Sequence, residues 1–411
     1  MNEVSKLTKL EYNNELVQKY SHLTRTINEE YINIHPIQRG GILTPEAYKA
    51  IIAYGDGYSI CDNCMKGRID KIENPPIIEF LRDLTRFLNI DNVLITASAR
   101  ESKRMVMEVL AKKYPNRKTV VIDSLAHYTT YLAIESNNLK LSEVPNSGEP
   151  EFRIDPTDYE KIINKVKDED NELPLLVLLT HVDYKYGNHN DPKSIAEICK
   201  KYNIPFLLNA AYSVGILPVD CKDFQVDFIT CSGHKSMAAS GPIGILGFKE
   251  EYYDDVINLS KIQGNISSKS FPSKVCNVMG CPPVYGAPLI TLMASFPSVV
   301  KRTQKEIADD ESKKANYVIE KIKNVKGVKI NGKLPKIHPL TNIKTEGFAE
   351  IAKTHPRKGF FVRDEFKERG IIGMLPGISK EMKYSTYGLT WDQIEHFTKS
   401  FIEIAEKYHL F

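Results

Sequence analysis

The segment SGHKSMAASGPIG, residues 232–244, follows directly on the apolar run VDFITC at residues 226–231. The apolar run has the length and the β-branched content of a short buried strand. The small residues after it allow a tight turn that other backbone segments can approach closely. Lysine is rarely buried without a partner. The pattern therefore predicts a turn at the end of a core strand, where Lys235 either binds something or stands exposed in a cleft.

The chain around this segment alternates between strand-like and helix-like patterns, from about residue 76 to about residue 250. Asp191 followed by Pro192 is typical of a helix start, and Ile195 and Cys199 then supply an apolar face. The alternation predicts a mostly parallel sheet of the seven-stranded type, covered by helices on both faces. Strands are expected at residues 92–96, 119–123, 175–181, 206–209 and 227–230, and a helix at residues 100–114.

The pattern changes after about residue 300, where lysine-rich helices precede short apolar runs. Strands are expected around residues 328–330 and 359–362, and a final helix from Asp392. This predicts a smaller α+β domain. The expected organisation is an N-terminal helical extension at 1–30, a large domain at 31–300 and a small domain at 301–411.

Composition limits the class of protein. The 411 residues have a formal net charge of +3 and are 42% hydrophobic, which is ordinary for a globular protein. The apolar runs are too short for a bilayer and the N-terminus is too polar for a secretory signal, so we expect a cytoplasmic protein without a membrane partner. The charge alone gives no argument for nucleic-acid binding. The seven cysteines are an odd number, so we expect no disulfide framework.

Polar residues follow the expected strands, and the carboxyl ends of parallel strands meet at one edge of a sheet. Residues 96–100, TASAR, end one strand and open a helix, whose free N–H groups form an anion site beside Arg100. His127, Asn209 and Lys235 follow other strands. The set suits pyridoxal phosphate. The helix start would hold its phosphate, His127 would stack on its ring, Asn209 would face its pyridine nitrogen and Lys235 would bond its aldehyde.

Each of these residues alone also has a structural interpretation, as a surface lysine, a helix cap, a structural histidine or a turn former. Their joint order favours a cofactor site, although the spacing alone leaves both interpretations open. The candidate cofactor-binding residues are Ala99, Arg100, His127, Asn188, Asn209, Ser232, His234 and Lys235.

Longer motifs carry a family resemblance. Lys235 in SGHKSMAASGP, with THVDYKYGN and NAAYSVG, resembles the cysteine-desulfurase branch of fold-type I pyridoxal phosphate enzymes. Three further stretches are typical of a smaller group of proteins within this branch: INIHPIQRGGILTPEA (32–47), YSICDNC (58–64) and PPVYGAPLITLMASFPSV (282–299). Together they resemble the archaeal O-phosphoseryl-tRNA:cysteinyl-tRNA synthases, from about residue 30 to the end of the chain. One departure from the wider superfamily is Asn209, where an aspartate commonly keeps the pyridine nitrogen protonated, so we expect a weaker electron sink.

The resemblance implies a substrate, phosphoserine esterified to a cysteine tRNA, and a reaction. Lys235 would remove the α-proton, phosphate would leave the β-carbon, and a sulfur nucleophile would add there. The substrate carboxyl is an ester, so no carboxylate clamp is required. The β-phosphate needs cationic partners, for which Arg100, His127 and Lys235 are candidates, with Arg39 a weaker one.

Cys61 and Cys64 form a Cys-x-x-Cys pair, and Cys281 lies in MGCPPVYGA. Three interpretations stay open: partly buried structural thiols, a persulfide site, or ligands of an iron–sulfur cluster. The resemblance implies that all three cysteines take part in sulfur delivery, and that Cys281 matches the family's third cysteine better than Cys276 does.

Two alternative functions remain. A cysteine desulfurase or selenocysteine lyase shares the fold but acts on a free amino acid, so it needs an arginine for the substrate carboxylate. A non-catalytic scaffold of the same fold in a tRNA-handling complex would bind no cofactor. The partners that the main interpretation implies are the phosphoserine-carrying tRNA(Cys), a sulfur donor, a second copy of the chain, a phosphoseryl-tRNA synthetase and a scaffold protein. The polar segment 261–275 is expected to reach the neighbouring copy's cofactor phosphate.

Overall fold

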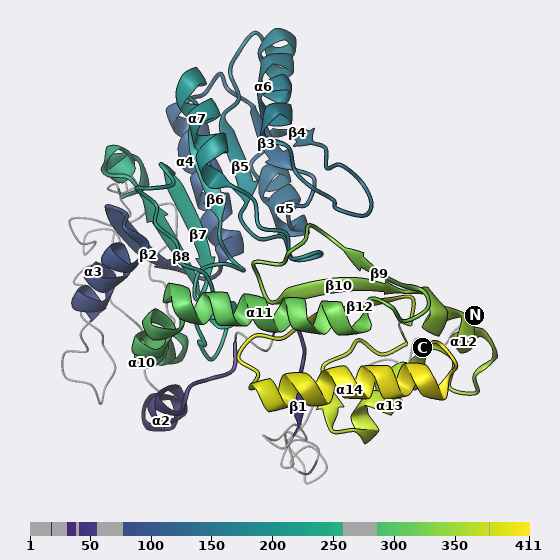
Figure 1. The fold of residues 1–411 in the computed structure, drawn as a ribbon. Coiled ribbons are helices and arrows are strands. Elements are labelled where there is room, and N and C mark those ends of the chain that lie inside the picture. The colour runs from purple at the N-terminus through teal and green to yellow at the C-terminus, as the bar shows by residue number, and fades with distance from the viewer. Residues whose placement is uncertain (1–17, 19–30, 38–40, 56–76, 258–285, 378) are drawn as a thin grey trace, which may run out of the picture.

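The apolar runs of the sequence form a seven-stranded sheet in the computed structural model (Figure 1). The structure describes residues 18, 31–37, 41–55, 77–257, 286–377 and 379–411. The predicted N-terminal extension therefore lies outside the described residues, apart from residue 18. In sheet order the strands are β2 (Asn92–Thr96), β8 (Gly244–Phe248), β7 (Phe228–Ser232), β6 (Phe206–Asn209), β5 (Leu176–Thr180), β3 (Thr119–Asp123) and β4 (Lys140–Val144).

The sheet is mostly parallel, as predicted. The strands from β7 to β4 run parallel to one another, whereas β8 runs antiparallel to both β2 and β7. Strands buried on both faces read as continuous apolar runs. β5 is an example, because Leu176 and Leu178 pack into the core on one face and Val177 and Leu179 into the core on the other.

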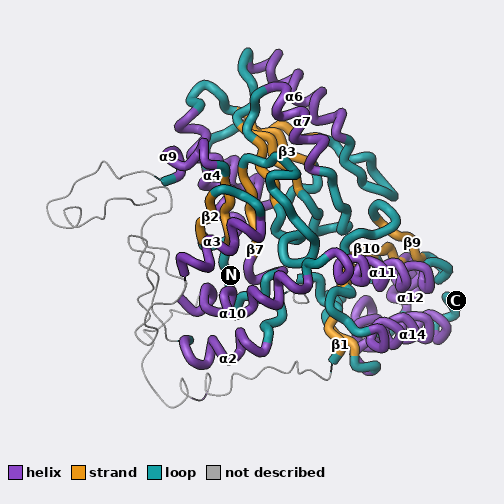
Figure 2. The backbone as a smooth tube through the Cα atoms, turned by 60° about the vertical axis from the view of Figure 1, so that its left-hand side comes forward, coloured by secondary structure: helices purple, strands orange, loops and turns teal. Residues whose placement is uncertain are grey.

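Helices cover both faces of this sheet (Figures 1 and 2). One face carries α4 (Ala99–Lys113), α5 (Tyr128–Ser136) and α9 (Tyr253–Val256), preceded by the short helix η1 (Glu250–Tyr252). The other carries α3 (Ile77–Leu88), α6 (Pro156–Asp170), α7 (Pro192–Tyr202) and α10 (Gly286–Arg302). The predicted helix start at Asp191 is confirmed, because its carboxylate accepts a hydrogen bond from the Lys193 N–H.

The C-terminal part has its own core around a three-stranded antiparallel sheet, in the order β12 (Glu381–Ser385), β10 (Leu340–Thr345) and β9 (Val328–Asn331). Its helices are α11 (Lys305–Ile322), α12 (Glu346–Thr354), α13 (Phe361–Glu368) and α14 (Trp391–Lys407). The predicted strand at 359–362 is wrong. These residues form the end of η3 (Lys358–Phe360) and the start of α13, where Phe361, Val362 and Phe366 are buried on one helix face.

The segment before the large sheet belongs to the C-terminal part. Strand β1 (Ile32–Asn33) pairs in parallel with β11 (Ile371–Ile372), and the Ile34 carbonyl accepts a hydrogen bond from the Ser385 N–H. Residues 32–34 were expected in the large domain, but they pair with strand β11 of the C-terminal part. Helix α2 (Pro45–Tyr54) then packs beside α10 (Figure 2). Among the described helices, none combines the length and the apolar character needed to cross a membrane.

Candidate active site

A cavity of about 610 Å³ lies at the carboxyl ends of the parallel strands. It includes residues that follow or end β5, β6 and β7, together with the start of α4 and one residue of β12. This edge of the sheet is where ligands of such folds bind. The lining residues are Ile37, Ala97, Ser98, Ala99, Arg100, Lys103, His127, Thr129, Thr180, Val182, Tyr184, Asn209, Ala211, Tyr212, Ser232, His234, Lys235, Pro242 and Lys383.

Lys235 lies in the short helix α8 (Gly233–Ser236), which follows β7 directly. Its Nζ atom is 4.3 Å from the centre of the Tyr212 ring. Burial, and then the positive charge of Lys383, lower the pKa of Lys235 to about 8. A lysine with this pKa is partly neutral near pH 8, which is the state that acts as a nucleophile or a base.

Close backbone packing holds the Lys235 turn in place. A Cβ on Gly41 would lie 2.3 Å from the His234 carbonyl oxygen, so only glycine allows this approach. Arg302, at the end of α10, donates hydrogen bonds to the Gly215 carbonyl at 3.2 Å and to the Ser236 carbonyl. Two backbone carbonyls of the motif, those of His234 and Ser236, thus meet the chain at Gly41 and at the end of α10.

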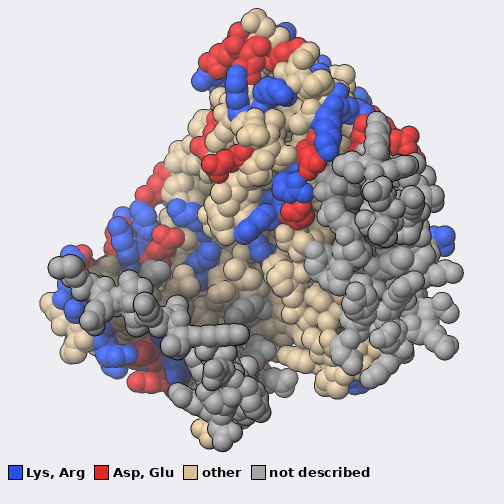
Figure 3. All heavy atoms as spheres, turned by 180° about the vertical axis from the view of Figure 1, so that it is seen from behind, with Lys and Arg blue, Asp and Glu red and all other residues tan. Residues whose placement is uncertain are grey.

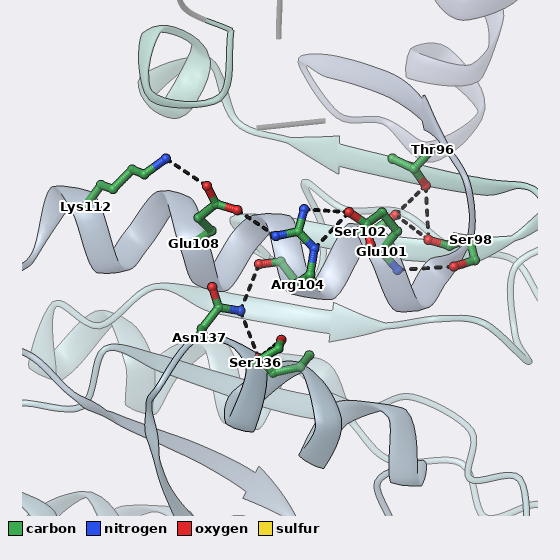
Figure 4. Close-up of polar contacts among 10 residues, drawn as sticks. Thr96, Ser98, Glu101, Ser102, Arg104, Glu108, Lys112, Ser136 and Asn137 are labelled. Carbon is green, nitrogen blue, oxygen red and sulfur yellow. Dashed lines mark hydrogen bonds and ion pairs between the residues drawn. The ribbon is translucent and has the colours of Figure 1, made fainter. Parts of the chain in front are cut away.

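The start of α4 lines the cavity, and Figure 4 shows the polar contacts that cap this helix. The Ser98 hydroxyl caps the helix by accepting from the Glu101 N–H at 3.2 Å, and the Thr96 and Ser102 hydroxyls are 2.7 Å apart. The first-turn N–H groups of Ala99 and Arg100 have no acceptor within the helix. A Cβ on Gly244 would lie 2.6 Å from the Ala99 nitrogen. Strand β8 can therefore approach this helix end only because residue 244 is a glycine.

Lys103 is a site residue that sequence analysis missed. It lies one turn into α4, is only 2% exposed, and donates to the hydroxyls of Thr129 at 3.0 Å and Thr130 at 2.7 Å. Burial, followed by the charges of Lys235 and Arg100, lowers the pKa of Lys103 to about 7. The signal in the sequence is its helical spacing, because Lys103 shares the buried face of α4 with Met107 and Leu110.

His127 caps α5 and is half-buried. Its Nδ1 accepts from the Thr129 N–H at 3.3 Å, which assigns the ring hydrogen to Nε2. Burial and then the charges of Lys235 and Lys103 lower the pKa of His127 to about 4. His127 is therefore a neutral ring at pH 7 rather than the cation that sequence analysis expected for a phosphate. Its ring meets the Tyr184 ring edge-on, with the centroids 4.8 Å apart.

Asn209, Ser232 and His234 also reach the cavity, as sequence analysis predicted for residues at strand ends. The Asn209 side chain is buried at the end of β6, and the Ser232 hydroxyl lies 3.3 Å from His234 Nδ1. Next to them is a hydroxyl that sequence analysis did not name. Thr180 Oγ1 is buried, yet it has no hydrogen-bond partner among the described residues.

Lys383 of β12 is a second residue that sequence analysis missed. It enters the cavity from the C-terminal part, and its Nζ donates to the Tyr184 carbonyl at 3.1 Å. Nearby carboxylates are already engaged. Asp123 accepts from the N–H groups of Leu125 and Thr180, and Asp183 accepts from three N–H groups of the turn that follows it. The cavity thus holds a surplus of positive charge, which suits anionic ligands.

The structure does not bring every candidate to this cavity. Asn188 lines a separate cavity, where its amide donates to the Glu151 and Phe152 carbonyls and accepts from the Lys333 N–H. These bonds hold two segments together, so Asn188 is placed as a structural residue rather than a cofactor ligand. Four other candidates lie outside the described residues, namely Arg39, Cys61, Cys64 and Cys281.

The fold and the cavity define a class of protein. The sequence profile of the family described as Aminotransferase class-V matches residues 78–355, which is more than half of the chain. The cysteine desulfurase of Thermococcus onnurineus NA1 has the same fold, with a TM-score of 0.72 at 17% identity over 92% of this chain and 95% of that one. The chain is thus an enzyme of the pyridoxal phosphate–dependent fold-type I class, as the family resemblance implied.

Nearer relatives narrow this class. The chain is 48% identical to the O-phospho-L-seryl-tRNA:Cys-tRNA synthase 2 of Archaeoglobus fulgidus, over 92% of this chain and 95% of the relative. It is 46% identical to the O-phospho-L-seryl-tRNA:Cys-tRNA synthase of Methanocaldococcus jannaschii, over 95% of this chain and 99% of the relative. A solved complex described as SepCysS with the SepCysE N-terminal domain matches with a TM-score of 0.84 and 44% identity, over 95% and 99%. The chain belongs to the O-phospho-L-seryl-tRNA:Cys-tRNA synthase family.

Proposed function

We propose that this enzyme converts O-phosphoseryl-tRNA(Cys) to cysteinyl-tRNA(Cys), with Lys235 as the catalytic lysine. The observation that carries the proposal is the positive charge of the cavity. Four cationic side chains line it, namely Lys103, Lys235, Lys383 and Arg100, and the nearby carboxylates already accept backbone hydrogen bonds. Such a space suits two phosphate groups, one on the cofactor and one on the substrate. A free amino acid would need an arginine for its carboxylate, and Arg100 is the only arginine among the described lining residues.

Pyridoxal phosphate fits the described cavity. The start of α4 supplies the N–H groups of Ala99 and Arg100 for its phosphate. Asn209 supplies an amide for the pyridine nitrogen, His127 supplies a ring face, and Lys235 supplies the amine that bonds the aldehyde. When bound, the cofactor draws electrons from the substrate α-carbon and so makes its proton acidic. An amide at Asn209 cannot hold a proton by charge, which suits a reaction with a good leaving group.

Lys235 moves the proton. The substrate amine first replaces the Lys235 amine on the cofactor. The freed, neutral Nζ of Lys235 then accepts the proton from the α-carbon of phosphoserine. The bond between the β-carbon and the phosphate oxygen then breaks, and its electron pair leaves with phosphate. Sulfur adds to the β-carbon, and Lys235 returns a proton to the α-carbon. The lowered pKa of Lys235, about 8, allows both directions of transfer near neutral pH.

Sulfur delivery is assigned to Cys61, Cys64 and Cys281, which lie outside the described residues. The reason is chemical, because none of the described lining residues of the cavity is a thiol. These cysteines carry sulfur either as a persulfide or as ligands of an iron–sulfur cluster. Iron analysis after anaerobic purification, with a cyanide-labile sulfur assay, distinguishes the two.

The assembly is proposed to be a homodimer. Segment 261–275, which is expected to reach the cofactor phosphate of the other copy, lies outside the described residues. The solved complex of a relative with the SepCysE N-terminal domain supports a scaffold partner for this chain as well, and a phosphoseryl-tRNA synthetase would then supply the substrate. On the face seen in Figure 3, Lys and Arg lie among Asp and Glu. We therefore expect modest tRNA binding that weakens with salt, through lysines near the cavity.

The test of this function is a reaction of the purified protein with pyridoxal phosphate, sulfide and phosphoseryl-tRNA(Cys), followed by analysis of the attached amino acid. Cysteinyl-tRNA together with released phosphate is the expected result. Sulfide release from free cysteine, without conversion of phosphoseryl-tRNA, would instead indicate a cysteine desulfurase. A protein that remains colourless with the cofactor would indicate a non-catalytic scaffold.

A further inference from the structure

Lys383 reaches the cavity because of the register of β12. Successive side chains of a strand point to opposite faces. Met382 and Tyr384 point into the core of the C-terminal part, where both are buried. Lys383 therefore points the other way, across the boundary between the two parts of the chain, and lines the cavity that also contains Lys235. No other residue of β12 lines this cavity.

The contacts of Lys383 differ from those of other lysines on the same sheet. Lys344, on the neighbouring strand β10, forms an ion pair with Glu149. Lys383 forms no ion pair with a described carboxylate, and its recorded hydrogen bond goes to the neutral Tyr184 carbonyl. Asp183 and Glu381 favour its charged form from a distance, yet burial still lowers the pKa of Lys383. A half-buried ammonium group without a direct ion pair therefore gains from an anion bound in the cavity that it lines.

The bound cofactor does not account for this charge. Its phosphate belongs at the start of α4, where Arg100 and Lys103 lie. Lys383 enters the cavity from β12 of the C-terminal part, and its charge acts on Lys235 and on His127. Lys235 acts at the α-carbon of the substrate, one bond from the carbon that carries the leaving group. A cation beside Lys235 is therefore within reach of a phosphate on that neighbouring carbon.

We propose that Lys383 binds the β-phosphate of the phosphoseryl group and thereby distinguishes phosphoserine from serine on the same tRNA. This inference rests on the proposed function and adds a specificity-determining residue to it. The ester carbonyl of the substrate is neutral and would leave the charge of Lys383 unmatched, whereas a phosphate dianion matches it. The leaving phosphate keeps this contact as its charge grows, so Lys383 also assists departure.

The experiment compares Lys383→Met with the wild-type holoenzyme, using two tRNA ligands in one assay. Phosphate release from phosphoseryl-tRNA(Cys) gives kcat/KM, and inhibition of that reaction by seryl-tRNA(Cys) gives a Ki. The variant should lose roughly 10- to 100-fold in kcat/KM, the range for one charged hydrogen bond, while the Ki of seryl-tRNA stays unchanged. Lys383→Arg should restore most of the loss, because guanidinium also binds phosphate. The matched control is Lys380→Met, an exposed lysine just before β12, which should change neither value.

Two results would overturn the assignment. If the Ki of seryl-tRNA rises by the same factor as kcat/KM falls, Lys383 contacts the ester or the tRNA rather than the phosphate. If neither value changes, Lys383 does not contact the substrate. The yellow colour of the lysine-bound cofactor, measured for both variants, shows that each folds and binds the cofactor. Failure of the wild-type enzyme to release phosphate would refute the proposed function itself and is recorded before any variant is compared.

Discussion

Replacing Lys103 by methionine should stabilise the cofactor-free protein near neutral pH. The side chain is only 2% exposed and has no carboxylate partner among the described residues, since its Nζ donates to the hydroxyls of Thr129 and Thr130. Burial, then the charges of Lys235 and Arg100, lower the pKa of Lys103 from 10.5 to about 7. Methionine has a similar length and no charge, so it removes the cost of burying an ammonium group.

The expected size follows from linkage. A fall of about 3.5 pKa units corresponds to roughly 5 kcal/mol of lost stability when Lys103 is charged in both states. The variant leaves two threonine hydroxyls without their lysine partner, at about 1 kcal/mol each. The net gain in the free energy of unfolding is therefore about 3 kcal/mol at pH 6. The unfolded chain holds this proton up to about pH 10.5 and the folded chain only to about pH 7, so wild-type stability recovers between these values.

The measurement is urea unfolding of both proteins without cofactor, followed by circular dichroism from pH 6 to pH 10. The advantage of the variant should be largest at pH 6 and vanish or reverse by pH 10. Lys112→Met is the control, because Lys112 lies on the same helix but is exposed beside Glu108. A variant that is less stable than the wild type at pH 6 would refute the reasoning, since it would mean that the charge of Lys103 is matched inside the protein.

Three other predictions concern Gly244, Lys235 and the three cysteines. Gly244→Ala should weaken cofactor binding at least tenfold, because its Cβ would push β8 away from the start of α4, and equilibrium dialysis with pyridoxal phosphate measures this; unchanged affinity would contradict it. Lys235→Ala should abolish both the colour of the bound cofactor and turnover, and turnover that persists with added cofactor would exclude its catalytic role. Serine at Cys61, Cys64 or Cys281 should prevent cysteine formation while phosphate release from phosphoseryl-tRNA partly survives; normal cysteinyl-tRNA formation with the physiological donor in all three would make the thiols structural.

The large sheet could be predicted because its central strands are continuous apolar runs, which carry their own signal. Two strands of this sheet were not predicted. The edge strand β4 has the polar sequence KLSEV, since an exposed edge does not need apolar residues. The internal strand β8 has the sequence GILGF, in which two glycines weaken the strand pattern. The segment 359–362 was misassigned because its aromatic residues favour a strand locally. In the structure those residues pack a helix against the C-terminal core, and that contact is not visible in the local pattern.

The site divides in the same way. The strand-end rule located Lys235, His127 and Asn209, because each follows a strand that the sequence shows. Lys103 is inside a helix and Lys383 comes from the other part of the chain, so neither follows a strand of the large sheet. Their place in the cavity depends on how α4 and β12 are packed, which the order of residues along the chain does not contain.

The pairing of β1 with β11 has a consequence for how the protein is made. Ile32 and Asn33 leave the ribosome before the large sheet does, but their strand partners, Ile371 and Ile372, are synthesised after it. The nascent chain can therefore assemble its large sheet long before the segment that carries Ile37 is anchored beside the cavity. Any step that needs Ile37 or Lys383 in place at the cavity therefore waits until the C-terminal part has been synthesised.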